Sequence, residues 1–308
     1  MLILSALSGR LGGQAVLEGV MMRGPERLTV AVRRPDNRIG VMMQSSRSRS
    51  GRGLARIPIL RGIIVTWEGL RLGVRALTES AKVVSGEDEA PTRGSISRAG
   101  MGVTIVVALA AAVALFFLVP LLVTRQLLDL QPGTTFWLVE GGVRILVLVL
   151  YLLALGLIPD MRRMMQYHAA EHMVIHAYEA GQPIDARTAA THPRHHARCG
   201  TGLLLAIMII AIIVFAAIGD RDPWVLVASR VAGIPLIAGV AYEVMRLIAS
   251  AQDSIIGRAL AVPGYLLQRL TTRTPTADHL EVACVALRRL LGVDPSITDP
   301  ASKAEVLA

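Results

Sequence analysis

The 308-residue sequence has little charge, few aromatic residues and only two cysteines. Charged residues make up 18% of the chain, against roughly 25% in soluble proteins, so polar surface is too scarce to cover a water-facing fold of this size. Aromatic residues at 4% are too sparse for a base-stacking platform, which argues against a nucleic-acid partner. Cys199 and Cys284 cannot build a disulfide framework. These shortages exclude an ordinary cytosolic enzyme.

Long apolar runs stand in place of that polar surface. Hydrophobic residues make up 53% of the chain and are concentrated in four segments. A helix needs about 20 apolar residues to cross the hydrocarbon core of a bilayer, and each segment is close to that length or longer. These segments are residues 101–124, 136–159, 202–219 and 224–250. The sequence therefore predicts an all-α integral membrane protein with about four transmembrane helices, the second carrying Glu140 and Arg144 as an internal ion pair.

The distribution of Lys and Arg predicts how these helices are oriented. Residues 1–100 hold sixteen, residues 159–200 hold five and residues 251–308 hold six, which makes 27. The short connections at 125–135 and 220–223 hold one each, Arg125 and Arg221. Because basic segments stay on the cytoplasmic side, we expect a multi-pass protein with both termini and the 160–200 loop in the cytoplasm.

Shorter elements are predicted outside the four spans. Residues 28–32 and 39–43 flank a turn-like stretch and predict a small β-hairpin. Residues 57–84 carry apolar side chains at helical spacing, which predicts an amphipathic helix in the membrane interface or across the cytoplasmic mouth of the bundle. The expected divisions are an N-terminal cytoplasmic segment with the hairpin (1–54), the interfacial helix and a linker (55–98), the four-helix bundle with a His-rich loop at 160–200 (99–250), and a C-terminal cytoplasmic helical segment (251–308).

A polar and basic stretch, SSRSRSGRG at 45–53, follows the hairpin. Its composition is typical of a solvated juxtamembrane loop that touches anionic lipid headgroups. An RNA-binding tail is the alternative. Membrane lipids are therefore the expected partners of this segment, and the oligomeric state stays open.

The candidate chemistry lies just after the second span. Residues 162–180 contain neither Gly nor Pro and end before Gly181, which predicts a helix. Within it, His168 and His172 are one turn apart on one face, so both imidazoles can reach the same divalent ion. Glu171 projects close to that face. This His-x-x-Glu-His order is typical of inverted zincins, in which two histidines bind zinc and the glutamate is the general base. Two surface histidines are the alternative.

Further donors could complete a metal site. Six of the seven histidines fall within residues 168–196, and the loop continues to Cys199. Imidazole and thiolate together favour Zn²⁺ over Mg²⁺. Glu243 lies near the predicted cytoplasmic end of the fourth span, where its carboxylate needs a partner, either Arg230 or Arg246 or the metal. The predicted cofactor is a divalent transition metal, zinc by preference, with the candidate ligands His168, His172, His196, Cys199 and Glu243.

The N-terminal block GGQAVLEGVMMRGP, residues 12–25, contains glycines that could suggest a phosphate-binding loop. No Gly-Lys-Ser/Thr follows them and no strand–helix unit encloses them, so we reject that interpretation. We expect Gly12, Gly13 and Gly19 instead to let the segment turn tightly against the bundle, with Glu18 facing inward. Whether Glu18 approaches the metal stays open.

This block resembles the YqhQ-like family of bacterial inner-membrane proteins. The resemblance covers nearly the whole chain and extends to four further stretches, at 167–178, 196–201, 241–243 and 270–273. The family usually has His-Pro-Arg-Cys-Gly-Thr where this chain has HARCGT, at 196–201, so the proline is lost and both candidate ligands are kept. Its members are described as predicted metal-dependent enzymes. The resemblance thus implies an inner-membrane location and a metal, without naming a reaction.

Two functions of different classes follow. The first is a metal-dependent hydrolase with a cytoplasm-facing site, Glu171 as general base, and a lipid-linked or membrane-protein substrate. The second is a non-catalytic scaffold or regulator in which zinc closes the 160–200 loop onto the bundle. A catalytic zinc usually has three protein ligands and an open position, whereas a structural zinc has four. The number of ligands therefore separates the two hypotheses.

Overall fold

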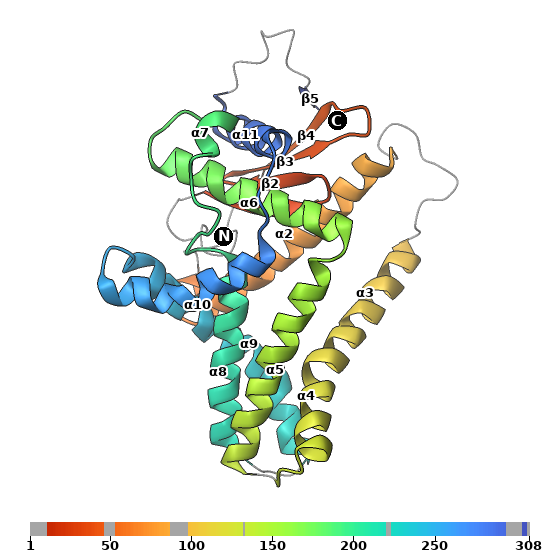
Figure 1. Cartoon of the computed structure of the whole chain (residues 1–308), viewed down its shortest axis with the longest axis vertical. Coiled ribbons are helices and arrows are strands. Elements are labelled where there is room, and N and C mark those ends of the chain that lie inside the picture. The colour runs from red at the N-terminus through yellow and green to blue at the C-terminus, as the bar shows by residue number, and fades with distance from the viewer. Residues whose placement is uncertain are drawn as a thin grey trace.

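The computed structural model describes residues 11–45, 53–86, 98–131, 133–219, 223–293 and 304–306. Most of the basic stretch at 45–53 and of the linker before residue 98 lies outside these ranges. Figure 1 shows two parts: a bundle of long helices, and a β-sheet with helices packed against it at one end of the bundle. The candidate site lies where these two parts meet.

The sheet is larger than the predicted hairpin. Its strands are β1 (Gly12–Val16), β2 (Gly19–Arg23), β3 (Arg27–Arg33), β4 (Ile39–Ser45) and β5 (Ala304–Val306), in that spatial order. Neighbours among β1–β4 are antiparallel, and β5 is parallel to β4. The β3–β4 hairpin was predicted and is confirmed. The predicted fold class, an all-α protein with a small hairpin, is corrected to a mainly helical protein with a β-sheet. Strand β2 is buried at every position, so it lacks the alternation that marks a half-exposed strand.

The expected tight turn is wrong for Gly12 and Gly13, because both glycines belong to strand β1, whereas Gly19 directly follows a turn. The turn comes five residues later, at Leu17 and Glu18, and joins β1 to β2. Glu18 has a φ of 49°, in the left-handed region that residues other than glycine seldom adopt. Gly19 then passes so close to β3 that a Cβ would lie 2.1 Å from the carbonyl oxygen of Ala31.

Helices cover both faces of the sheet. One face packs against α6 (Pro159–Glu179) and α11 (Ala277–Leu291), with a core that includes Val20, Ile39, Val174 and Leu287. The other face packs against α2 (Leu60–Ser85). The predicted helices at 57–84 and 162–180 and the helical character of the C-terminal segment are therefore confirmed. The N-terminal strands share one core with α11.

Among the residues that the structure describes, four helices are long and apolar enough to cross a membrane, at Val106–Leu127, Thr134–Leu155, Gly200–Ile218 and Ala232–Ser250. They belong to a helix running from α3 (Arg98–Val113) through the π-helical η2 (Ala114–Leu118), α4 (Val119–Leu122) and the π-helical η3 (Val123–Leu127), and to α5 (Thr134–Leu155), α8 (Gly200–Ile218) and α9 (Pro223–Ser250). The count of four agrees with the sequence. Glu140 and Arg144 pair with each other, buried in α5.

Helix α2 crosses the boundary between the two parts (Figure 1). Its small residues face the protein, and a Cβ on Gly62 would lie 2.6 Å from the carbonyl oxygen of Gly239 in α9. Its large apolar side chains point outward, with Trp67 69% and Leu70 58% exposed. Two shorter helices, α7 (Ala186–Ala189) and α10 (Ile255–Thr271), and the 3-10 turn η1 (Gly53–Arg56) complete the fold.

Candidate metal centre

Helix α6 positions the paired histidines. Pro159 and Asp160 suit the first turn of a helix, because proline presets φ there and the carboxylate complements the helix dipole. The side of α6 against the sheet and α11 is buried, and His168 and His172 follow one another along the same face. Their ring centroids lie 4.5 Å apart. The predicted shared face is thus present.

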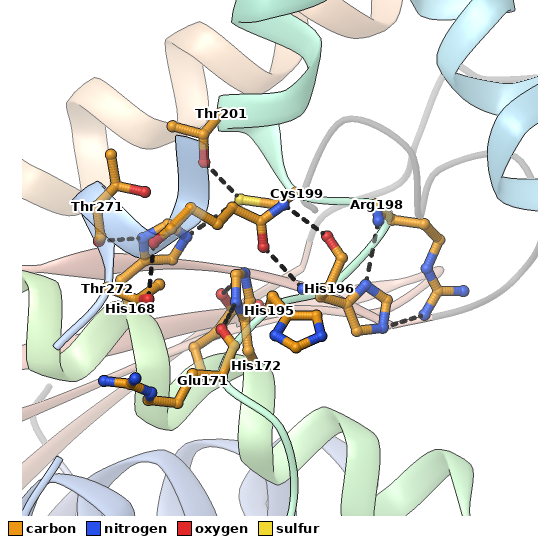
Figure 2. A network of polar contacts seen from close by, with 12 residues as sticks. His168, Glu171, His172, His195, His196, Arg198, Cys199, Thr201, Thr271 and Thr272 are labelled. Carbon is orange, nitrogen blue, oxygen red and sulfur yellow. Dashed lines mark hydrogen bonds and ion pairs between the residues drawn. The ribbon is translucent and has the colours of Figure 1, made fainter. Parts of the chain in front are cut away.

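Cys199 reaches the two histidines from another part of the chain. It is the residue that precedes α8, and its sulfur lies 3.2 Å from Nε2 of His168 and 2.8 Å from Oγ1 of Thr201. Figure 2 shows the sulfur and the His168 ring facing one another across the site. One ligand atom each from His168, His172 and Cys199 lies within 4.8 Å of the other two. Small side-chain adjustments would bring all three to the 2.0–2.3 Å at which zinc binds nitrogen and sulfur.

Backbone carbonyls orient both imidazoles. Nδ1 of His168 lies 3.0 Å from the carbonyl oxygen of Thr271, and Nδ1 of His172 lies 2.5 Å from that of Arg194. A carbonyl only accepts hydrogen bonds, so each neutral ring carries its proton on Nδ1 and presents the Nε2 lone pair to the site. Metal-binding histidines almost always have such an outer acceptor. When neutral, each ring is therefore in the tautomer that a metal requires.

Two buried polar atoms at the centre have no hydrogen-bond partner among the described residues, Nε2 of His172 and Oε1 of Glu171. The side chains of His172 and Glu171 are 0% and 1% exposed, and the shortest contact between them is 3.7 Å. An unpaired group of this kind costs about 1–3 kcal/mol when buried and needs an explanation. An ion with a bound water, placed between the two side chains, would satisfy both atoms.

A cavity of about 510 Å³ opens beside these groups. His168, Glu171, Cys199 and Thr271 form part of its wall, next to residues 13–15 of strand β1. The remaining wall is mainly apolar, and comes from the end of α5, the start of α6 and the middle of α2. These apolar residues are Leu152, Leu155, Met161, Met164, Met165 and Leu70. A ligand could therefore reach the candidate metal ligands directly.

The ionisable groups of the site change one another's pKa values. Burial by itself would lower the pKa of His168, but the adjacent Cys199 sulfur raises it to about 9. Burial would raise the pKa of the Cys199 thiol, but the rings of His168 and His172 hold it well below its usual range. Burial raises the pKa of Glu171. The sulfur is thus poised as a thiolate, the form that binds metals.

His196 does not join this group. It lies with His176 and Glu179 in a second cluster, where its Nε2 is 3.3 Å from Oε2 of Glu179. Its Nδ1 accepts from the backbone N–H of Arg198, and the Arg198 guanidinium binds the other oxygen of Glu179. Burial lowers the pKa of His196 to about 3, so the ring is neutral. Burial alone would raise the pKa of Glu179, but hydrogen bonds from His196 and Arg198 lower it to about 2. The cluster is therefore an ion-pair network that holds the loop before Cys199.

The structure also places Glu243 and Glu18 elsewhere. Nη2 of Arg61 in α2 lies 2.5 Å from Oε2 of Glu243, with Arg246 at 3.5 Å from the same oxygen. This ion pair ties α2 to α9 and satisfies the carboxylate without a metal. Glu18, in the β1–β2 turn, binds Arg163 at 2.5 Å, which lowers its pKa. Neither carboxylate belongs to the cluster of His168, His172 and Cys199.

The model of a protein family of unknown function (DUF1385) matches residues 57–293. The uncharacterized protein YqhQ of Bacillus subtilis (strain 168) is 30% identical over 296 residues, which cover 92% of each chain. The chain belongs to the YqhQ-like family. No solved structure matches it. The predicted family is confirmed, and it supplies neither a cofactor nor a reaction.

The roles of several residues that shape the site in this YqhQ-like chain could not be predicted from the sequence. Thr271 and Arg194 contribute backbone carbonyls, which no residue type reveals. Gln268 of α10 holds the loop before Cys199 through two hydrogen bonds to His196. Its side-chain oxygen accepts from the backbone N–H at 2.8 Å, and its amide nitrogen donates to the backbone carbonyl at 3.0 Å. Gly13 lies against Glu171, where a Cβ would be 2.6 Å from Oε1. The conspicuous N-terminal glycines were the only available hint of that last contact.

We expect Gly13→Ala to displace the Glu171 carboxylate, because neither the strand backbone nor the buried side chain has room for a methyl group. Overpacking of this kind typically costs about 1–3 kcal/mol. Thermal unfolding in detergent should show a lower Tm. Gly142→Ala is the matched control, because a Cβ there meets nothing within 4 Å. An unchanged Tm for Gly13→Ala would contradict the close packing of β1 on Glu171.

Proposed function

We propose that the protein is a membrane-embedded, metal-dependent hydrolase with a cytoplasm-facing site that acts on a lipid-linked or membrane-protein substrate. One observation carries the proposal: three ligand atoms lie within 4.8 Å of one another, beside an open cavity and a buried glutamate whose Oε1 has no hydrogen-bond partner among the described residues. Zinc is the preferred ion, because the donors are two imidazoles and a thiolate. Metal analysis of the purified protein, combined with substitutions of these residues, tests the proposal.

Each residue then has a role in hydrolysis. His168, His172 and Cys199 hold the ion, which supplies the Lewis acidity that lets water act as a nucleophile near neutral pH. Glu171 accepts a proton from the attacking water and later gives it to the leaving group. Its raised pKa suits this exchange, because a general base works best when its pKa lies near the working pH. The carbonyls of Thr271 and Arg194 keep the two imidazoles oriented.

The ligand count favours catalysis over a structural zinc. A closed site would need a fourth protein ligand, and the two candidates, His196 and Glu243, are held by Glu179 and Arg61 respectively. That arrangement leaves three ligands and an open position, as in catalytic zinc sites. The scaffold hypothesis predicts four ligands instead.

A second candidate function is a cysteine hydrolase without a metal. The 3.2 Å contact between the Cys199 sulfur and Nε2 of His168, with Thr271 on the other ring nitrogen, is the arrangement of a nucleophile, its base and an orienting group. This alternative gives no role to the unpartnered Nε2 of His172. Metal content separates the two, because a cysteine hydrolase keeps full activity after chelation.

The exposed side of α2 supports a position at the membrane surface. Trp67, Leu70, Val74 and Leu77 are 69%, 58%, 46% and 39% exposed, and they follow one another at helical spacing. An apolar face of this kind, next to four apolar helices, is suited to lie at the boundary of headgroups and acyl chains. Membrane lipids are then the partners of α2, and the cavity lies at the depth of the headgroups.

The proposed orientation predicts where reporters will be found. A reporter fused after Gly133, in the short connection before α5, should be periplasmic. A reporter fused after Ala308 should be cytoplasmic, because basic residues are concentrated in the segments that precede α3, follow α5 and follow α9. Paired alkaline phosphatase and green fluorescent protein fusions measure both positions. A periplasmic C-terminus would place the metal centre on the opposite side and contradict the proposal.

A further inference from the structure

Strand β1 is at the edge of the sheet that the cavity reaches. Among the described residues its strand neighbour is β2, on one side only. Figure 1 shows the successive strands descending from β5 and β4 at the top toward the bundle. The free edge of β1 therefore faces the region where α2, α6 and the end of α5 surround the cavity, which residues 13–15 line.

The register identifies the backbone groups at this edge. The N–H of Arg33 donates to the carbonyl of Glu18 at 2.7 Å. The next pair, Gly19 and Val32, is therefore a non-hydrogen-bonded pair of the β2–β3 ladder. The backbone N–H and C=O of Gly19 then point away from β3, toward β1. Gly19 thus exchanges both hydrogen bonds with Val16. Alternation then makes Gln14 the next bonded position. The N–H and C=O groups between these positions, at residues 13 and 15, point away from β2.

Helix α2 occupies only one end of this edge. At the turn end, the N–H of Leu17 donates to Oγ of Ser80 at 3.2 Å. Farther along β1 the helix presents small residues, and the cavity separates it from Gly13 and Ala15. Two donors and two acceptors of β1 therefore adjoin the cavity, and each can pair with an extended backbone.

Acyl chains could fill the apolar part of the cavity but could not satisfy these four groups. An extended peptide can do both, because its backbone pairs with the strand edge while alternate side chains enter apolar pockets. The same edge passes the catalytic group, since Glu171 packs directly on Gly13. A peptide bond added beside β1 would therefore lie next to the candidate metal ligands.

We infer that the substrate is an extended peptide segment, which binds by adding a strand to the free edge of β1 at residues 13–15, and that the hydrolase is a peptidase. The hydrolytic reaction in this inference rests on the proposed function. The choice of a peptide as substrate rests on the free edge of β1. In the reaction, the oxygen of water bonds to the peptide carbonyl carbon, the C–N bond breaks, and Glu171 carries a proton from the water to the departing amine. The products are a carboxylate and a protonated amine, because the second proton of the water also ends on the amine nitrogen.

Ala15→Pro tests the edge selectively. Proline removes the N–H of residue 15, which points away from β2, and leaves every β1–β2 hydrogen bond in place. Ala15→Val is the matched control, because it adds bulk and keeps the N–H. Both variants are made in a Glu171→Gln background, so that bound peptides are not cleaved, and their Tm and metal content are measured.

The full-length proteins, in detergent, are immobilised and exposed to a degenerate library of ten-residue peptides. We expect a subset of peptides to be retained by the parent and by Ala15→Val, with about tenfold weaker binding to Ala15→Pro. Tenfold corresponds to about 1.4 kcal/mol, the size of a single lost hydrogen bond. Resynthesis of retained peptides with alternate backbone amides methylated should abolish binding to the parent protein, which tests the edge even if Ala15→Pro does not fold.

Two results would overturn the inference. One is an absence of retained peptides, or equal retention by the parent and by a folded Ala15→Pro. The other is saturable binding of pyrene-labelled phosphatidylglycerol without retention of peptides, which would assign the cavity to an acyl chain. Metal content is a separate readout. Edge-dependent peptide binding by a protein that binds no metal would refute the hydrolase and leave the docking strand intact.

Discussion

His172→Ala is expected to yield a protein that binds almost no transition metal, whereas the wild-type protein binds about one equivalent per chain. His172 supplies one of only three ligand atoms in the cluster, and its Nε2 has no other partner among the described residues. Changing a residue that merely orients a ligand costs 10–100-fold in affinity, so loss of a ligand should exceed about 100-fold. Elemental analysis after dialysis against a buffered chelator measures the difference.

Two matched controls should retain the metal. His176→Ala removes the next imidazole along α6, whose Nε2 instead contacts the carbonyl of His195 at 2.9 Å. Glu243→Gln weakens the ion pair with Arg61 and leaves the cluster untouched. Metal loss in Glu243→Gln would restore that carboxylate as a ligand. Full occupancy in a protein lacking both His168 and His172 would end the metal hypothesis.

Local periodicity made the helical part of the site predictable. His168, Glu171 and His172 are within one turn of α6, so their spacing alone determines that they share a face. The four apolar helices were predictable for a similar reason, because the length and composition of each run are sufficient evidence. Cys199 was selected by chemistry rather than by distance, since a thiol among histidines suits zinc.

Long-range pairings could not be predicted in this way. The sequence offered Arg230 or Arg246 as the partner of Glu243, but the shortest contact is with Arg61, 182 positions away in the chain. It placed His196 with the metal ligands, but Glu179 and Arg198 hold this ring after the chain has turned back along α6. Strand β2 escaped detection because its burial at every position removes the alternating pattern.

Glu171→Gln should retain the metal and the fold and lose the activity. Glutamine has the same shape, and its amide fits the space between Gly13 and His172 that the carboxylate fills. It cannot take a proton from water, and a positioned general base typically contributes 10²–10⁴-fold to the rate. Competitive growth of a strain carrying only the variant gene measures function. We expect the defect to equal that of His172→Ala.

The contrast between these two variants separates an enzyme from a scaffold. In a scaffold the metal contributes to folding, so His172→Ala and Cys199→Ser should lower the Tm with the metal they lose, and Glu171→Gln should be silent. In an enzyme, Glu171→Gln is as defective as His172→Ala while its metal content and Tm match the wild type. Normal growth of a metal-loaded Glu171→Gln strain would exclude the hydrolase, and a Tm that falls on chelation would then favour the scaffold.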